Sequence, residues 1–182
     1  MALTTVRSTG IGSLPAISGA NLTSLNASNI SSGTLNSARF SGGKILQVLE
    51  TSYATEVSST NSSAWTDTGL TLNITPSATS SKILFLISQQ GFVTRASSYT
   101  RGLFRVLRGS TTVYDSANWT ISSQQNGSDI SHASMFVFNG LDSPSSTSAL
   151  TYKTQMLPDS STTMKAQQSN HPSKIVLMEV SV

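Results

Sequence analysis

Residues 20–40 constrain this chain more than any other part of it. Apolar side chains recur there at intervals of three to five positions, and the residues between them are mostly Asn, Ser, Thr and Gly. This narrow stripe consists of Leu22, Leu25, Ile30, Leu35 and Phe40. Burying five such side chains contributes on the order of 10 kcal/mol, whereas ordering twenty residues costs about 1–2 kcal/mol for each. We therefore expect the segment to be ordered only where several copies of the chain wind together or where it docks on another protein.

The chain divides into three parts by composition. Residues 1–19 place glycines and Pro15 between single apolar residues, which is typical of an extended arm with no core of its own. Residues 20–43 carry the stripe and end in Ser-Gly-Gly, which we interpret as a hinge. Residues 44–182 have the length and apolar content of one globular domain.

That domain is predicted to be all-β. Alternating apolar and polar residues predict strands at 70–74, 150–156 and 176–182, and an uninterrupted apolar run predicts a central strand at 82–88, covered on both faces. Further strands are expected at 44–50, 103–107, 111–114, 135–138 and 162–167. Gly109 marks a hairpin, Asn139-Gly140 should end the strand before it, and the last strand should lie inside a sheet. Many short strands with polar turns favour an antiparallel β-sandwich, most economically a jelly roll.

Composition argues against several functions. Charged residues are only 10% of the chain, and its net charge of +3 comes from bases that are scattered singly, so we expect no nucleic-acid binding. No apolar run approaches the roughly 20 residues of a membrane span, so we expect no membrane insertion. The chain has no cysteine, which excludes disulfides and cysteine-based zinc sites.

Catalytic and metal-binding patterns are sparse. The two histidines, His132 and His171, have few acids near them, and no phosphate-binding loop is present. Four aspartates in or near loops are candidates for calcium, but turn formation explains them better because they lack calcium-loop spacing: Asp115, Asp129, Asp142 and Asp159. We therefore predict no catalytic residues, no metal and no cofactor.

Aromatic residues among polar neighbours are the best candidates for surface recognition. Tyr99 and Trp119 are the candidate receptor contacts, because exposed aromatic rings bind sugars or flat protein surfaces at low entropic cost. For Trp119, covering an end of the sandwich is an equally good interpretation. For Trp65, covering an end of the sandwich is the favoured one.

Residues 29–40 read Asn-Ile-Ser-Ser-Gly-Thr-Leu-Asn-Ser-Ala-Arg-Phe. This segment resembles the shaft repeats of bacteriophage tail fibres, which run Asn-Ile-x-Ser-Gly-Thr-Leu/Val-x-x-Ala-Arg-Leu; Phe40 replaces the final Leu. The stretches 75–84, 104–109 and 174–180 are similar to the globular modules that end such fibres. The resemblance implies a homotrimer on the surface of a phage particle, with the stripe of residues 22–40 as its seam and a three-lobed knob beyond it.

Three functions compete. The first is a non-enzymatic fibre or adhesin knob, held to another virion protein (tail, fibre or capsid) through residues 1–40 and contacting a host surface glycan or protein. The second is a capsid decoration trimer that stabilises the shell, since the chain is short and holds one clear shaft repeat. The third is a glycan-cleaving spike enzyme. It is disfavoured because glycoside hydrolysis needs two well-placed carboxylates and the chain has only eight acids.

Overall fold

The structure is a computed structural model that describes residues 44–96, 99–116, 118, 120–124 and 129–181. The predicted arm and shaft, with the seam residues Leu22, Leu25, Ile30, Leu35 and Phe40, lie outside the described residues, as does Trp119. Among the described residues no helix has the length and apolar character needed to cross a bilayer.

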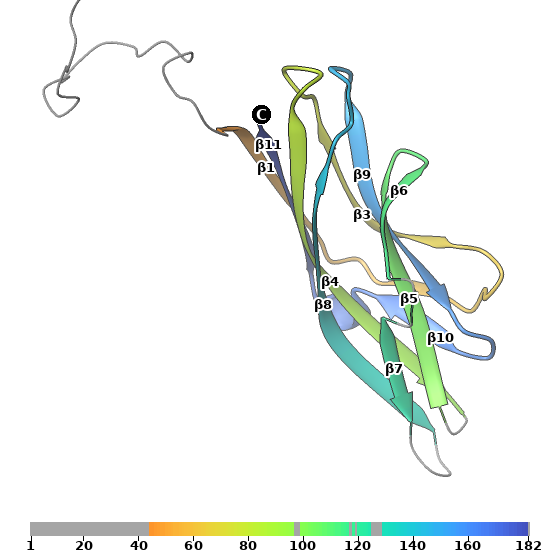
Figure 1. The fold of residues 1–182 in the computed structure, drawn as a ribbon. Coiled ribbons are helices and arrows are strands. Elements are labelled where there is room, and N and C mark those ends of the chain that lie inside the picture. Colours follow the sequence, from red (N-terminus) through yellow and green to blue (C-terminus); the bar gives the residue numbers. More distant parts are fainter. Residues whose placement is uncertain (1–43, 97–98, 117, 119, 125–128, 182) are drawn as a thin grey trace, which may run out of the picture. The chain divides into compact units, whose positions relative to one another are not determined.

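The described residues form eleven strands and one short 3₁₀ turn, Gln168–Asn170 (Figure 1). The strands are β1 Ile45–Tyr53, β2 Val57–Ser59, β3 Thr66–Ile74, β4 Lys82–Arg95, β5 Tyr99–Arg108, β6 Thr111–Asp115, β7 Ile121–Gln124, β8 Ile130–Asp142, β9 Leu150–Pro158, β10 Thr163–Ala166 and β11 Ser173–Val180. The predicted all-β antiparallel sandwich is confirmed.

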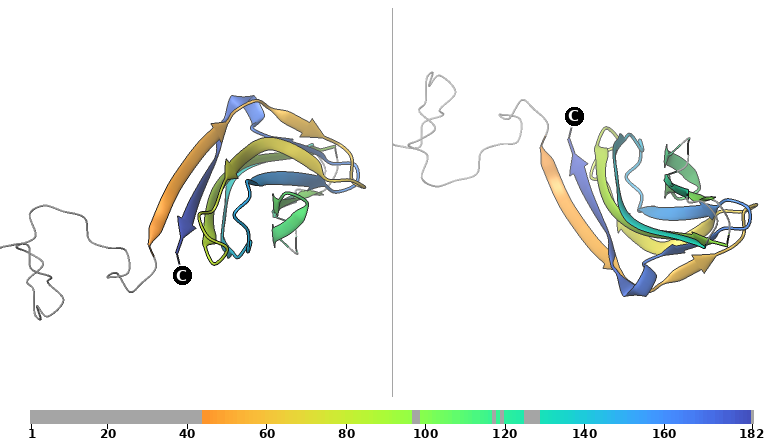
Figure 2. Two further views of the ribbon diagram at one scale, coloured as in Figure 1. Left: turned by 90° about the horizontal axis from the view of Figure 1, so that it is seen from above. Right: turned by 90° about the horizontal axis from the view of Figure 1, so that it is seen from below.

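Two antiparallel sheets make up the sandwich (Figure 2). In the first, sheet A, one edge of β4 pairs with β8, and its other edge pairs first with β11 and then with β10. The sheet continues beyond these strands, because β1 pairs with β11 and β2 pairs with β10. In the second, sheet B, β9 lies between β3 and β5, and the far edge of β5 pairs with β7 and then β6. The predicted interior position of the last strand is confirmed, because β11 lies between β1 and β4.

The core forms between the inner faces of the two sheets. Alternate residues of β4, including Phe85, meet Phe104 of β5 and Tyr152 of β9, and all three side chains are almost wholly buried. Gly69 interrupts the register of β3 at a positive φ of 87°, where the ring of Tyr53 fills the space that a Cβ would need. Glycine is required there both by the backbone conformation and by the contact.

A hydrogen-bonded network of polar side chains crosses the core and ties the sheets together. Thr154 Oγ1 of β9 donates to Gln89 Oε1 of β4 at 2.8 Å, and it shares a second hydrogen bond with the hydroxyl of Thr68 in β3. Gln89 Nε2 in turn donates to Ser173 Oγ of β11 at 2.9 Å. Because each buried group has a partner, the network fixes the register between the sheets without a large desolvation cost.

Two sequence predictions about strands are corrected. The strand expected to end at Asn139-Gly140 continues to Asp142, because Gly140 pairs with Phe85 and lies under its ring, where a side chain would clash. The strand at 82–88 was expected to be covered on both faces. Its inner face packs on sheet B, but Leu86 on the outer face is 38% exposed.

The domain has two distinct ends along β4. Ile45, Val180 and Lys82 lie side by side at one end, so β1 begins and β11 finishes there. Arg95 is at the other end of β4, opposite Ile130. At about 3.3 Å per residue, the strand separates these ends by roughly 40 Å.

Candidate functional site

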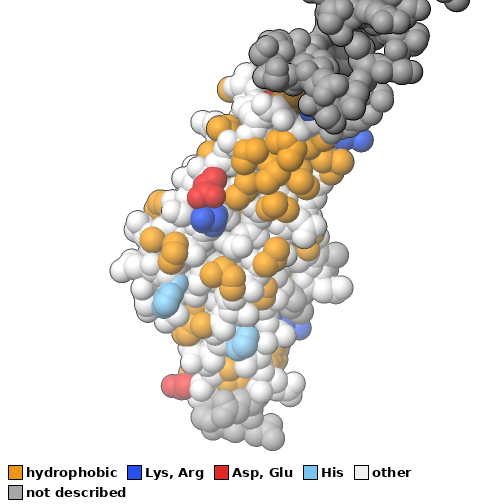
Figure 3. Space-filling model, turned by 90° about the vertical axis from the view of Figure 1, so that its left-hand side faces the viewer, with side chains coloured by type: hydrophobic (Ala, Val, Ile, Leu, Met, Phe, Trp, Pro, Cys, Tyr) orange, Lys and Arg blue, Asp and Glu red, His pale blue; other side chains and the backbone are white. Residues whose placement is uncertain are grey.

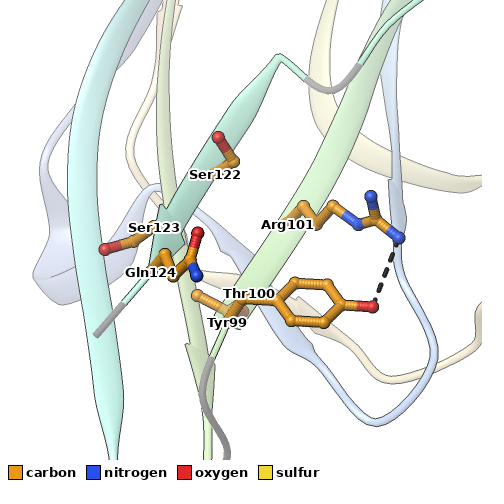
Figure 4. A pocket seen from close by; sticks show the side chains of 6 residues that line it. All are labelled: Tyr99, Thr100, Arg101, Ser122, Ser123 and Gln124. Carbon is orange, nitrogen blue, oxygen red and sulfur yellow. Dashed lines mark hydrogen bonds between the residues drawn. The ribbon is translucent and has the colours of Figure 1, made fainter. Parts of the chain in front are cut away.

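A polar hollow lies at the end of the domain that is far from Lys44. It forms because β7 pairs with the first half of β5, which sets Tyr99 opposite Gln124 and Arg101 opposite Ser122. The hollow has a volume of about 370 Å³ and is lined by Tyr99, Thr100, Arg101, Ser122, Ser123 and Gln124 (Figure 4). Its walls present hydroxyl, amide and guanidinium groups beside one aromatic ring.

Tyr99 is held by two guanidinium groups. The Cζ atoms of Arg95 and Arg101 lie 5.2 and 4.8 Å from the centre of its ring, within the range of cation–π attraction. Arg101 Nη2 also donates to the Tyr99 hydroxyl at 3.4 Å (Figure 4). The ring is therefore oriented while 38% of the residue stays exposed.

The two arginines differ in their partners. Arg101 Nε donates to Asp159 Oδ2 at 2.9 Å, and this hydrogen bond raises the pKa of Arg101. Burial alone would raise the pKa of the Asp159 carboxyl, but the hydrogen bonds from Arg101 and the Ser160 backbone, with the attraction of Arg101 and Arg95, together lower it. Arg95 is different, since its Nε and Nη1 are buried and have no hydrogen-bond partner among the described residues. The exposed Tyr99 ring and the Arg101 guanidinium beside it in the wall of the hollow suit a ligand with sugar hydroxyls or a carboxylate.

The predicted aromatic residues have different locations. Tyr99, a predicted receptor contact, lines the hollow. The expectation that Trp65 covers an end of the sandwich is wrong. The Arg105 guanidinium stacks 4.3 Å from its ring, on the outer side of sheet B, because Trp65 immediately precedes β3.

The remaining members of the hollow were not predicted. Thr100 and Arg101 lie on β5, and Ser122, Ser123 and Gln124 belong to β7, a strand too short and polar to be recognised from its sequence. The available signal was the local order Arg95, Tyr99, Arg101, which places two cations within four residues of an aromatic ring.

The carboxylates do not converge on a metal. Asp142 accepts hydrogen bonds from Arg108 Nη1 at 2.7 Å and from the Tyr152 hydroxyl at 2.6 Å, while Asp159 binds Arg101. In the part of the chain that the structure describes, no group of three or more His, Asp or Glu side chains could hold a metal ion.

Comparison with known proteins gives only distant similarities. No protein-family model and no curated protein matches this chain. Among solved structures, it is similar to infectious bursal disease virus, Gx strain (11% identity, 75% of this chain and 40% of that chain, TM-score 0.30), and to the VP2 subviral particle of the same virus (14% identity, 75% and 37%, TM-score 0.32). The chain thus spans less than half of the length of those chains. TM-scores in this range leave the function to be argued from the residues of the chain itself.

Proposed function

We propose that this protein is a non-enzymatic structural component of a bacteriophage particle, a homotrimeric tail-fibre or adhesin-type knob on the particle surface. Residues 1–40 attach it to another virion protein, and the far end of the sandwich contacts the host surface. The resemblance of residues 29–40 to fibre shaft repeats supports the assignment. The observation that carries it is the separation of the two ends. The chain enters the domain at Lys44, and the hollow around Tyr99 lies at the opposite end of β4.

The proposed ligand is a host surface glycan or protein with hydroxyl and carboxylate groups. The exposed ring of Tyr99 supplies a stacking surface, and Arg101 in the wall of the hollow supplies positive charge. A single site of this size binds weakly, but three sites at one end of a trimer bind with much greater avidity when they engage together.

The hydrogen bonds and pKa shifts of the carboxylates support a non-enzymatic role. Six of the eight acids make ion pairs or hydrogen bonds within the domain: Glu50, Glu56, Asp67, Asp142, Asp159 and Glu179. Burial alone would raise the pKa of Asp67 and Asp159, but their hydrogen bonds and nearby cations together lower it. At Glu56 the hydrogen bond from Lys165 is the main cause of a lowered pKa, and burial opposes it less strongly. A glycoside hydrolase needs the reverse, a general acid whose pKa is raised.

Capsid decoration is the second candidate, and the single copy of the shaft repeat favours it. Under that alternative, the chain stabilises the shell and the Tyr99 hollow has no ligand. Counting copies in purified particles separates the two, because a decoration protein is present in hundreds of copies and a fibre in a few dozen at most.

The binding proposal is tested with the full chain and the bacterial cells that the phage infects. We expect Tyr99→Ala to weaken cell binding at least tenfold and Tyr99→Phe, which keeps the ring, to retain most of it. Thr71→Ala, at an exposed position on sheet B away from the hollow, is the matched control. Equal binding by Tyr99→Ala and the unmodified chain would contradict the proposed contact.

A further inference from the structure

The outer face of sheet A carries apolar side chains aligned across four strands. The register sets Val48 of β1 beside Met178 of β11, Met178 beside Leu84 of β4, and Leu84 beside Leu141 of β8. The next row sets Val176 beside Leu86. Figure 3 shows a continuous hydrophobic patch on this face, toward one end of the domain.

The side chains at the two edges of these rows are exposed in the single chain, and Met178, Leu84 and Val176 between them are half-buried. Val48 and Leu141 are each 54% exposed, and Ile45, where β1 begins, is 61% exposed. Single apolar residues on a surface are ordinary, but a contiguous apolar patch of this kind marks an interaction surface. The uninterrupted apolar sequence of β4 also indicates an interaction surface, because such runs are typical of strands that are buried on both faces.

The charges beside the patch allow it to meet a copy of itself. Glu50 and Lys174 lie next to the apolar rows and pair with each other at 3.0 Å, so together they present no net charge. Lys82 lies beside Val180 in the row of Ile45, at the end of the patch and outside its two central rows. Identical faces can therefore approach without opposing like charges directly, which would otherwise cost several kcal/mol.

The position of the patch also points to copies of this chain. The patch reaches Ile45, immediately after the point where residues 20–43 join the domain, and the apolar stripe of that segment is expected to pack against sister chains. Copies that meet along residues 20–43 start their domains close together. The sheet that begins there is the one brought against its neighbours.

We propose that the outer face of sheet A, centred on Val48, Met178, Leu84, Leu86 and Leu141, is the surface through which copies of this chain pack against one another. In this arrangement, the outer face of sheet B points away from the other copies. This inference rests on the proposed homotrimer and names the part of the domain that forms it.

The absence of cysteine makes single-cysteine labelling a direct test. Leu86→Cys and Leu141→Cys place a thiol on the outer face of sheet A, and Asn73→Cys places the control thiol on the exposed face of sheet B. In the assembled full chain, we expect both sheet A thiols to react with a maleimide at least tenfold more slowly than the control. On dilution to the monomer, the rates should converge.

Each other outcome has a separate meaning. Equal rates in a chain that sediments as an oligomer overturn the inference but leave the homotrimer standing. If the sheet A thiols react slowly in a chain that sediments as a monomer, residues 1–43 of the same chain cover sheet A. This outcome also overturns the inference. A chain that is monomeric at every concentration, with all thiols equally reactive, contradicts the proposed homotrimer as well.

Discussion

The outer faces of the two sheets differ although their inner faces are built alike. On sheet B, Asp67 accepts from Lys153 Nζ at 2.9 Å and from Gln155 Nε2 at 2.6 Å, and Arg105 stacks on Trp65. On sheet A, the equivalent positions hold Val, Leu and Met. The charged and polar side chains of sheet B therefore form a surface suited to solvent, whereas sheet A exposes apolar area. We propose that a second surface covers this area.

The largest expected effect comes from placing charge on the outer face of sheet A. In the double variant Val48→Glu/Leu141→Glu, each site loses about 1.5–3 kcal/mol of apolar burial, so self-association should weaken by roughly a hundredfold to ten-thousandfold. Sedimentation velocity across a dilution series measures this change. Because both positions are exposed in the single chain, the circular dichroism spectrum should not change.

The matched control is Asn73→Glu/Thr111→Glu, which adds the same charge at two exposed positions of sheet B. It should associate like the unmodified chain. If both double variants weaken association equally, net charge explains the effect and the contrast between the two faces is lost.

A second prediction compares two carboxylates in opposite environments. Glu179 of β11 is 1% exposed and accepts from the backbone and hydroxyl of Ser77, each at 2.7 Å, and from Gln47. Burial alone would raise the pKa of Glu179, but these hydrogen bonds outweigh it and lower the pKa from 4.5 to about 2. Asp67 is an exposed carboxylate in a surface ion pair.

Because its pKa is lower in the folded chain, Glu179 stabilises the fold fully above pH 4.5 and loses this contribution as the pH falls toward 2. We expect Glu179→Gln to reduce the free energy of unfolding at neutral pH by roughly 3 kcal/mol and to flatten its decline below pH 4.5. Asp67→Asn should change the free energy of unfolding at neutral pH by less than about 1 kcal/mol. Urea unfolding at several pH values measures both, and a similar acid dependence in the two variants would contradict the assignment to Glu179.

The smallest expected effect concerns Trp65 on the outer side of sheet B. Trp65→Ala removes the stacking on Arg105, which contributes about 0.5–1 kcal/mol at a partly exposed site. Thermal unfolding should show a modest destabilisation with no change in association, and Trp65→Phe should recover part of it. A loss of association in Trp65→Ala would place part of the interface on sheet B.

Local patterns in the sequence predicted much of the fold. The alternation in 70–74 and 150–156 corresponds to β3 and β9, and the hairpin at Gly109 joins β5 to β6 as expected. Gly140 shows the limit of such reasoning. Asn-Gly is a common turn signal, but here the glycine continues a strand because the Phe85 ring, 55 residues earlier in the chain, needs the space.

The candidate site was less predictable because it depends on pairing between distant strands. Tyr99 was recognisable as an aromatic residue among polar neighbours, but its hollow forms only when β7 pairs with β5. Asp159, the partner of Arg101, belongs to the turn after β9. The apolar run of β4 likewise predicted burial on both faces, yet nothing in its sequence distinguishes cover by the same chain from cover by another.

We propose that copies of this chain cover the apolar face that sheet A exposes in the single domain. The most direct measurement is the mass of the unmodified full chain by sedimentation equilibrium at micromolar concentration. We expect a species of three chains, each of 19.2 kDa. A single species of 19.2 kDa throughout the micromolar range would show that the chains do not associate through sheet A.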